Sequence, residues 1–354
     1  MKKYLFLAAA SIALASCVND EKMEMAPKAQ KISFDMPVMG AQTRANEFGE
    51  IDGTAYPTTE DFVVYAKQHS GNFTGWDAAT DFWTSTGLTV TYDAGGYWDT
   101  AEDYFWPEDP YKLTFAAYSP ATSSGTKSYG ATGLTITDFE SPADVAGQYD
   151  LMYSVRSKDN TEATNASVGA TITFKHALSS IVFAAIDGDT KADYEITSLT
   201  LACPNWGNEA TFTQNINEAS NTESPSWTVP TTASVNYNMY SGTYTVSGTQ
   251  GYVTGSGSAA GKATAILAIP QDVPADAAVT LVYNKKPVLG SIQTGITKTV
   301  LLKNFLQTDA SQITNWEING RYTYVFNFGS GKKIFFKPVV EDWVEKATGY
   351  ITID

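Results

Sequence analysis

Short stretches in which apolar and polar residues alternate run through most of this chain. Leu113, Phe115 and Ala117 lie on one side of such a stretch, because successive side chains of a strand point to opposite faces. Turn-forming Gly, Pro, Asn and Asp separate these stretches, and no segment keeps a helical period for more than a few turns. The pattern therefore predicts an all-β protein. The expected strands are 62–67, 88–92, 112–118, 134–139, 151–155, 170–174, 179–186, 194–201, 244–246, 263–269, 278–283, 296–302, 322–328, 332–340 and 350–353.

The number of expected strands suits two β-sandwiches, which are built from about seven short strands each. A length of 354 residues is also typical of two domains of ordinary size. We expect an amino-terminal sandwich over residues 45–174 and a carboxy-terminal sandwich over residues 175–354. Residues 18–44 precede both and combine a tether with one further strand.

That further strand is the segment 31–38. Its apolar residues alternate with polar ones, which predicts a half-buried strand, and Pro37 confines it to a sheet edge or a strand end. The following segment, 40–46, is small and polar without any period, so we expect an exposed loop of the kind that proteases cut. The loop contains Arg44 followed by Ala45; a plain linker arginine is the alternative. The apolar side of the strand consists of Ile32, Phe34, Met36 and Val38.

Residues 1–17 have the features of an export signal. Two lysines follow Met1, and the apolar stretch 4–14 is too short to span a bilayer. Small residues then lead directly to Cys17, an arrangement that resembles the lipobox of bacterial lipoproteins. In that family the cysteine thiol carries a diacylglyceryl group and becomes the first residue of the mature chain. An ordinary secretory signal with an incidental cysteine is the alternative.

Composition narrows the range of functions. The chain has 23 Lys and Arg against 38 Asp and Glu, a formal net charge of -15, and an acidic surface repels nucleic acid. Two Cys and two His leave no Cys/His zinc site and little scope for histidine-based catalysis. We expect a protein that is not an enzyme, with no catalytic residues, no metal and no cofactor. The 20 Tyr, 17 Phe and 8 Trp favour strands.

Six short motifs occur in one order along nearly the whole chain, and each is weak by itself. As a series they resemble the fimbrillin family, the lipoprotein-derived subunits of type V pili. The motifs are TRA at 43–45, YFWP at 104–107, LTFAAYSP at 113–120, DLMYS at 150–154, FKHALS at 174–179 and FKPVVEDW at 336–343.

The resemblance implies two tandem transthyretin-like β-sandwiches and a route of assembly. The precursor would be lipidated at Cys17, carried to the outer membrane and cut after Arg44 by an Arg-specific, gingipain-type protease. The cut would remove the lipid and strand 31–38 together, and the carboxy-terminal strand of another pilin subunit would take the vacant place. The role as shaft, anchor or tip subunit stays open. The tail offers two alternating donor segments, one with Ile334, Phe336 and Val340 and one with Ile351 and Ile353.

Two other classes of function fit the sequence. One is a surface lipoprotein that does not polymerise and binds a glycan or host ligand, with Trp76, Trp83 and Trp98 as a stacking platform. The other is a glycosidase, which needs two carboxyl groups across the scissile bond. Four acids near Trp106 are candidates, although a solvated rim is their more common role. These acids are Glu102, Asp103, Glu108 and Asp109.

Overall fold

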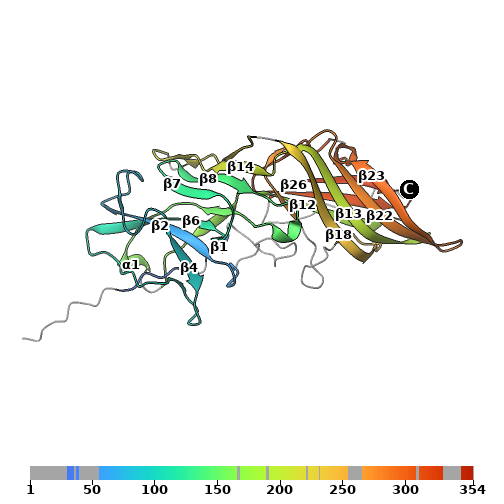
Figure 1. Ribbon diagram of the computed structural model, residues 1–354. Helices are drawn as coiled ribbons and strands as arrows, with labels where there is room; N and C mark the ends of the chain where they lie inside the picture. The colour runs from blue at the N-terminus through green and yellow to red at the C-terminus, as the bar shows by residue number, and fades with distance from the viewer. Residues whose placement is uncertain are drawn as a thin grey trace, which may run out of the picture.

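A computed structural model describes residues 30–35, 37–39, 56–165, 168–188, 191–220, 222–230, 232–253, 265–307, 311–329 and 344–353. The molecule is elongated, with the earlier strands gathered at one end and the later strands at the other (Figure 1). Nearly all regular structure in the described residues is strand, which confirms the predicted all-β class. The described helices are α1 (Glu162–Asn165) and two 3₁₀ turns, Val145–Gly147 and Leu302–Asn304.

One large sheet organises the amino-terminal region. Its central strands β2 (Phe62–Ser70) and β6 (Tyr111–Ser119) pair antiparallel from Val63↔Tyr118 to Ser70↔Tyr111. Strand β3 (Thr80–Asp81) pairs with β2, and β10 (Ser157–Asn160) pairs with β6. The full order is β1 (Val38–Met39), β11 (Thr173–His176), β9 (Met152–Ser154), β6, β2, β4 (Leu88–Tyr92) and β5 (Trp98–Thr100).

Both faces of this sheet are apolar. Phe62 and Val64 of β2 enter one hydrophobic cluster, whereas Val63 and Tyr65 enter another on the opposite face. The unbroken apolar start of β2 is what a strand covered on both sides requires. The first cluster is covered by the amino-terminal segment described below, and the second by another sheet.

That second sheet joins distant parts of the sequence. Strands β7 (Thr126–Gly130) and β8 (Gly133–Glu140) form a hairpin, and β14 (Glu209–Thr213) pairs with β8. Strand β17 (Ser226–Thr228) then pairs with β14. Segment 209–228 therefore lies in the amino-terminal region although it follows residue 175. The domain boundary near residue 175 stays a prediction. Segment 209–228 follows that boundary in sequence but pairs with strands that precede it.

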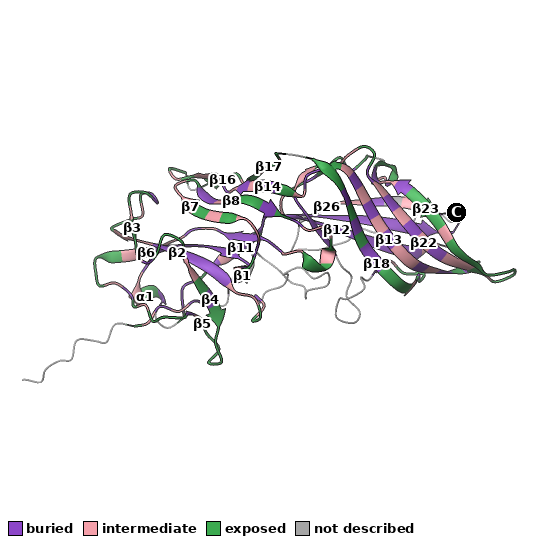
Figure 2. Cartoon of the chain, viewed as in Figure 1, coloured by how far each residue is buried: buried purple, intermediate pink, exposed green. Residues whose placement is uncertain are grey.

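Two sheets enclose the core of the carboxy-terminal region. Buried residues alternate with less buried ones along several of their strands in Figure 2. One sheet has the order β18 (Ala233–Thr245), β13 (Ala192–Trp206), β22 (Ala278–Pro287) and β23 (Gln293–Leu301). The other has the order β19 (Gly251–Tyr252), β12 (Ser179–Asp187), β25 (Gly320–Phe328) and β26 (Val344–Ile353), with β20 (Ile266–Ala268) also on β12. Short pairs are β15 (Ile216–Asn217) with β16 (Thr222–Glu223) and β21 (Gln271–Asp272) with β24 (Asn315–Trp316).

Most expected strands are present, with different lengths. Strand β4 has the predicted bounds, whereas β13 extends to Trp206 and β18 begins at Ala233, well before the expected 244. Strand β13 buries Cys203 completely, and this burial raises the pKa of its thiol to about 12. The expected strand 332–340 lies outside the described residues.

Candidate strand-binding site

Residues 30–35 and 37–39 are here called the amino-terminal segment, and two of them lie in the large apolar cluster of the amino-terminal region. Ile32 and Phe34 are each only 2% exposed, while Lys31 and Ser33 are half-buried and Asp35 is exposed. The Phe34 ring meets the rings of Phe62 and Phe115 edge-on, at centroid distances of 6.0 and 5.4 Å. The segment therefore places its apolar face in the core and its polar face outside.

Backbone hydrogen bonds hold this segment on both sides. On one side, Ile32 N donates to Tyr104 O (2.7 Å), Phe34 N donates to Trp98 O (2.9 Å) and Trp106 N donates to Gln30 O (3.0 Å). On the other side, Asp35 N donates to Ala170 O (3.2 Å) and Ala170 N donates to Ser33 O (2.9 Å). The segment thus lies between residues 98–106 and residues 169–174, and these two stretches together are here called the seat.

The segment changes partner along the seat. Phe34 forms an antiparallel bridge with Trp98 and a parallel bridge with Ala170, and β1 then pairs in parallel with β11 through Val38↔Thr173. Strands β5 and β11 are separated by several strands in the order of the large sheet. The segment therefore connects two distant edges of one sheet (β1 in Figure 1), and its removal would leave unpaired backbone groups on both.

A lysine between two carboxylates fixes the start of the segment. Lys31 Nζ lies 3.0 Å from Asp99 Oδ2 and 2.9 Å from Asp103 Oδ1. Hydrogen bonds to Asp103 and then to Asp99 raise the pKa of the Lys31 ammonium above its ordinary value of 10.5, against the lowering effect of burial. These contacts set the position of the segment along the seat.

A glycine lets the segment approach closely on the other side. Gly169 has a φ of +83°, and a Cβ built there would lie 2.4 Å from Asp35 N and 2.7 Å from the Phe34 carbonyl carbon. Any larger residue at this position would meet backbone, which cannot move aside as a flexible side chain can. Gly169 is therefore part of the seat.

Aromatic side chains under the segment form a floor that belongs to the rest of the chain. The Tyr56 ring packs against Trp98 and Phe174 at centroid distances of 5.1 and 5.6 Å. Its hydroxyl lies 2.5 Å from Ser119 Oγ. Burial raises the pKa of the Tyr56 hydroxyl well above its ordinary value. This floor does not depend on the amino-terminal segment for its own hydrogen bond.

At the other end of the chain, β26 is the outermost strand of its sheet. It pairs in parallel with β25 from Gly320↔Val344 to Phe328↔Ile353. Ile353 is 1% exposed and lies in the carboxy-terminal core, and Ile351 packs against the same core. The remaining predicted site residues lie outside the described residues: Cys17, Met36, Arg44, Ala45, Ile334, Phe336 and Val340, together with the side chain of Val38.

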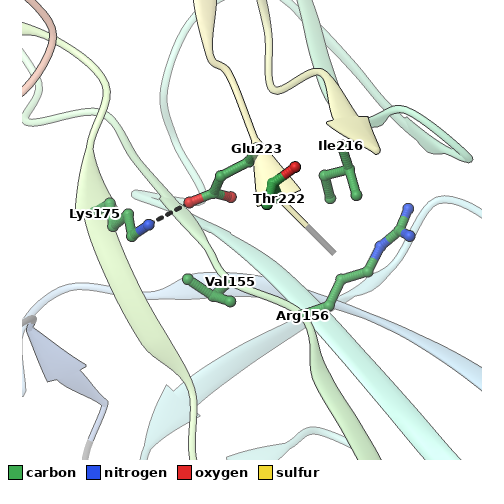
Figure 3. Close-up of a pocket in the computed structure, with 6 residues that line it drawn as sticks. All are labelled: Val155, Arg156, Lys175, Ile216, Thr222 and Glu223. Carbon is green, nitrogen blue, oxygen red and sulfur yellow. Dashed lines mark hydrogen bonds and ion pairs between the residues drawn. The ribbon is translucent and has the colours of Figure 1, made fainter. Parts of the chain in front are cut away.

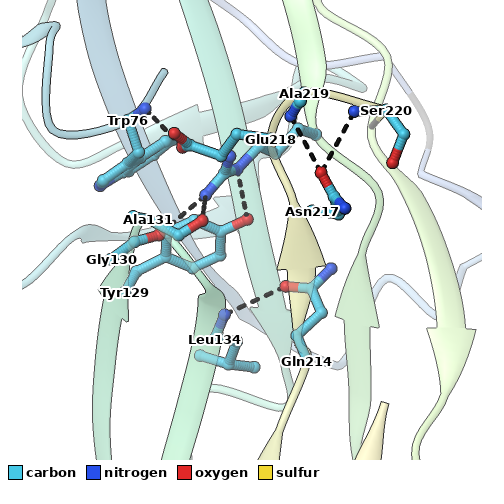
Figure 4. Close-up of polar contacts among 11 residues, drawn as sticks. Trp76, Tyr129, Gly130, Ala131, Leu134, Gln214, Asn217, Glu218, Ala219 and Ser220 are labelled. Atoms are coloured by element: carbon cyan, nitrogen blue, oxygen red, sulfur yellow. Dashed lines mark hydrogen bonds and ion pairs between the residues drawn. The ribbon is translucent and has the colours of Figure 1, made fainter. Parts of the chain in front are cut away.

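Arg156 is the centre of a buried polar network, part of which Figure 4 shows. Its guanidinium donates to the carbonyl oxygens of Gly130 and Ala131 at 2.8 and 2.9 Å and pairs with Glu218 Oε1 at 3.0 Å. The same Glu218 oxygen accepts a hydrogen bond from Trp76 N at 2.7 Å. The arginine thus ties the β7–β8 hairpin to segment 214–220, and no local sequence pattern predicts this link.

A small cavity of about 320 Å³ lies beside this network, lined by residues of β11 and of the β15–β16 hairpin (Figure 3). Lys175 and Glu223 form an ion pair across it. The pair already satisfies both charges. The lining is Val155, Arg156, Lys175, Ile216, Thr222 and Glu223.

The predicted stacking platform is wrong. Trp76, Trp83 and Trp98 are 3%, 8% and 1% exposed, because their rings fill the two apolar clusters of the amino-terminal region. A ligand therefore cannot stack on them. The four acids of the glycosidase alternative are exposed around a buried Trp106, and Asp103 is engaged with Lys31.

Two further observations concern chemistry and membranes. His176 Nδ1 and Asp150 Oδ1 are 2.9 Å apart and both residues are buried, which is an internal structural pair. Across the described ranges, no group of three His, Cys, Asp or Glu residues could hold a metal ion. In the same part of the chain, every helix is too short or too polar to cross a bilayer.

These features define a β-sandwich protein that seats an amino-terminal strand between two sheet edges. A sequence model of the fimbrillin-like family matches residues 43–343, and the chain therefore belongs to the fimbrillin-like family. It is a pilus or adhesion subunit of the cell surface and not an enzyme.

Solved structures include similar chains. A fimbrial protein from Bacteroides vulgatus is 16% identical, with 84% of this chain and 94% of that chain covered and a TM-score of 0.48. A candidate cell adhesion protein from Bacteroides uniformis is 14% identical, with 89% and 99% covered and a TM-score of 0.49. A search of curated protein sequences found no match.

Proposed function

We propose that this chain is a subunit of a type V pilus that assembles by exchange of one strand for another. It is made as a lipoprotein carrying lipid on Cys17 and held at the outer membrane. An Arg-specific, gingipain-type protease cuts after Arg44 and releases residues up to that point. The carboxy-terminal strand of a neighbouring pilin subunit then enters the seat, and repetition of this contact builds an extracellular filament.

The observation that carries the proposal is the double-sided seat of the amino-terminal segment. Burial of Ile32 and Phe34 contributes about 3–6 kcal/mol together, and the backbone bonds on both sides add about 0.5–1.5 kcal/mol each. A neighbour's strand of similar pattern regains both contributions. Insertion of a tail into a groove is a heterologous contact, which generates open filaments instead of closed dimers.

The arginines of the chain support a single cut. Arg156 and Arg321 are only 6% and 2% exposed, and Arg321 lies within the central strand β25. A protease needs an extended, accessible backbone, which neither position offers. The chain has three arginines in all. Arg44 therefore remains as the target in the folded protein.

Strand β26 is bound within its own sheet, which favours 334–340 as the donated segment. Its ladder with β25 spans the whole strand, and Ile353 lies in the carboxy-terminal core. Donation of β26 would empty that core position. Segment 334–340 repeats the spacing of Ile32, Phe34 and Val38 through Ile334, Phe336 and Val340.

Substitution of the cleavage residue tests the proposal. We expect Arg44→Ala to give a folded monomer that stays intact with an Arg-specific protease and forms no filament by electron microscopy. Arg44→Lys is the matched control, because it keeps the positive charge and removes only the side chain that an Arg-specific protease recognises. Wild-type protein should show a new amino terminus at Ala45. Filaments that form at the usual rate from either uncut variant would contradict the proposal.

A further inference from the structure

The ion pair at the start of the seat has a counterpart in the tail sequence. Lys31, Ile32 and Phe34 form the pattern K-I-x-F, in which the lysine binds the two carboxylates and the isoleucine and phenylalanine fill the core. The same pattern occurs once more, as K-I-F-F at 333–336. The equivalent residues there are Lys333, Ile334 and Phe336.

We propose that residues 333–340 of a second copy occupy the seat in the direction of residues 31–38, with Lys333 between Asp99 and Asp103. Ile334 and Phe336 then take the positions of Ile32 and Phe34. This inference rests on the proposed function and adds to it the direction and the register of the donated segment.

The alternative registers are unfavourable. Side chains of a strand alternate, so a slip by one residue turns Lys333 and Lys337 toward the core. A slip by two residues in one direction puts Lys332 in the buried position of Ile32. A slip by two in the other direction puts Pro338 in the position of Phe34 and leaves Phe335 facing the two aspartates. The lysine therefore selects one register.

Charge favours the incoming strand over the resident one. Segment 332–340 carries Lys332, Lys333 and Lys337 without any acid, whereas segment 31–38 carries one lysine and one aspartate. The seat is acidic, with Asp99 and Asp103 at its start and Glu162 Oε1 accepting from Gln30 N at 3.2 Å. Attraction between opposite charges speeds encounter, and salt weakens it.

Disulfide trapping in the assembled full-length protein tests the register. A chain with Phe105→Cys and Lys333→Cys should, after Arg-specific cleavage and filament formation, give a ladder of covalent oligomers on a non-reducing gel. Lys31 and Phe105 face each other in an antiparallel bridge, and Lys333 would take the place of Lys31. The matched control combines Phe105→Cys with Phe335→Cys, two residues further along, and should give no ladder. Cys17 leaves with the released segment, and Cys203 is fully buried.

The outcomes separate the register from the proposed function. Filaments in which only the Phe335→Cys pair cross-links, or in which neither pair does, overturn the register and leave strand exchange standing. Cleaved wild-type protein that forms no filaments overturns both.

A charge reversal gives a second measurement. Lys333→Glu should slow filament growth about tenfold at low salt, because two ion pairs become repulsions. Lys332→Glu makes the same change in net charge one residue outside the anchor and should slow growth less than about threefold. High salt should narrow the difference. Equal effects of the two variants overturn the role of Lys333.

Discussion

The amino-terminal segment and β26 come from the earliest and the latest described parts of the chain, and they are held in different ways. Strand β26 has a nearly continuous ladder with one neighbour and a buried Ile353 at its end. The amino-terminal segment has bonds on both sides but only a few on each, and it changes partner within ten residues. Its position depends on Ile32 and Phe34 in the core and on the Lys31 ion pairs.

The difference shows that a strand can be specific without a long ladder. The backbone bonds of β26 are those that any strand could form, so its register depends on the side chains of its own core. The seat recognises the amino-terminal segment through the ionic contact of Lys31 and the two buried apolar side chains. Another segment with the same pattern can make the same contacts. A seat that recognises a pattern of side chains is suited to exchange.

The largest loss of stability in this comparison should come from Phe34→Ala in the uncut precursor. Loss of a buried aromatic ring lowers the free energy of unfolding by about 3–5 kcal/mol, and thermal melting of the uncut precursor should show it. The cut protein no longer contains residue 34, so its melting should match that of cut wild-type protein.

Ile353→Ala provides the matched control in β26. It should lower stability by about 2–5 kcal/mol, before and after cleavage alike. Equal effects of Phe34→Ala on the cut and uncut forms would contradict release of the segment.

A smaller effect is expected from Gly169→Ala. The new Cβ would meet the backbone of residues 34 and 35, and the positive φ adds strain, so we expect a loss of about 1–3 kcal/mol in the precursor. Gly71→Ala is the control, since Gly71 has a φ of +70° and open space around it. Chemical denaturation gives the free energy of unfolding of each variant. The loss in Gly71→Ala reports the backbone strain alone, and the additional loss in Gly169→Ala reports the clash with the segment. Equal losses would show that Gly169 does not limit the approach of the segment.

The smallest effect should come from Lys31→Ala, at about 0.5–1 kcal/mol, because the ammonium is partly exposed. The folded pKa of Lys31 lies above its ordinary value of 10.5. The ion pairs therefore stabilise fully below about pH 10.5 and lose this contribution as pH rises through the folded pKa. Melting curves of wild type and variant should converge in that alkaline range. A constant difference up to the most alkaline pH would argue that the lysine acts through packing alone.

Much of the fold could be predicted from alternation, and particular misses have physical reasons. Strand β18 buries Val235, Tyr237 and Met239 but carries Asn at 236 and 238, so a residue type common in turns obscured the pattern. Strand β14 was missed because its apolar positions are few, and its partner β8 is far away in sequence.

The site was predictable only in part. Alternation identified Ile32 and Phe34 as residues of one apolar face, and both are buried. The ion pair of Lys31 could not be foreseen, because Asp99 and Asp103 are distant in sequence and exposed acids are common. The stacking platform was wrongly predicted because aromatic content shows how much apolar surface a chain has. It does not show whether a given ring lies in the core or on the surface.

Strand β14 has a mechanical consequence. It joins β8 by hydrogen bonds, and Leu267 and Ile269 belong to the same hydrophobic cluster as residues of both strands. Ser141 Oγ also donates to Leu267 O at 2.6 Å. The two regions therefore share hydrogen bonds and apolar packing in addition to the chain that connects them. A force that separates or bends them against each other must break these contacts as well.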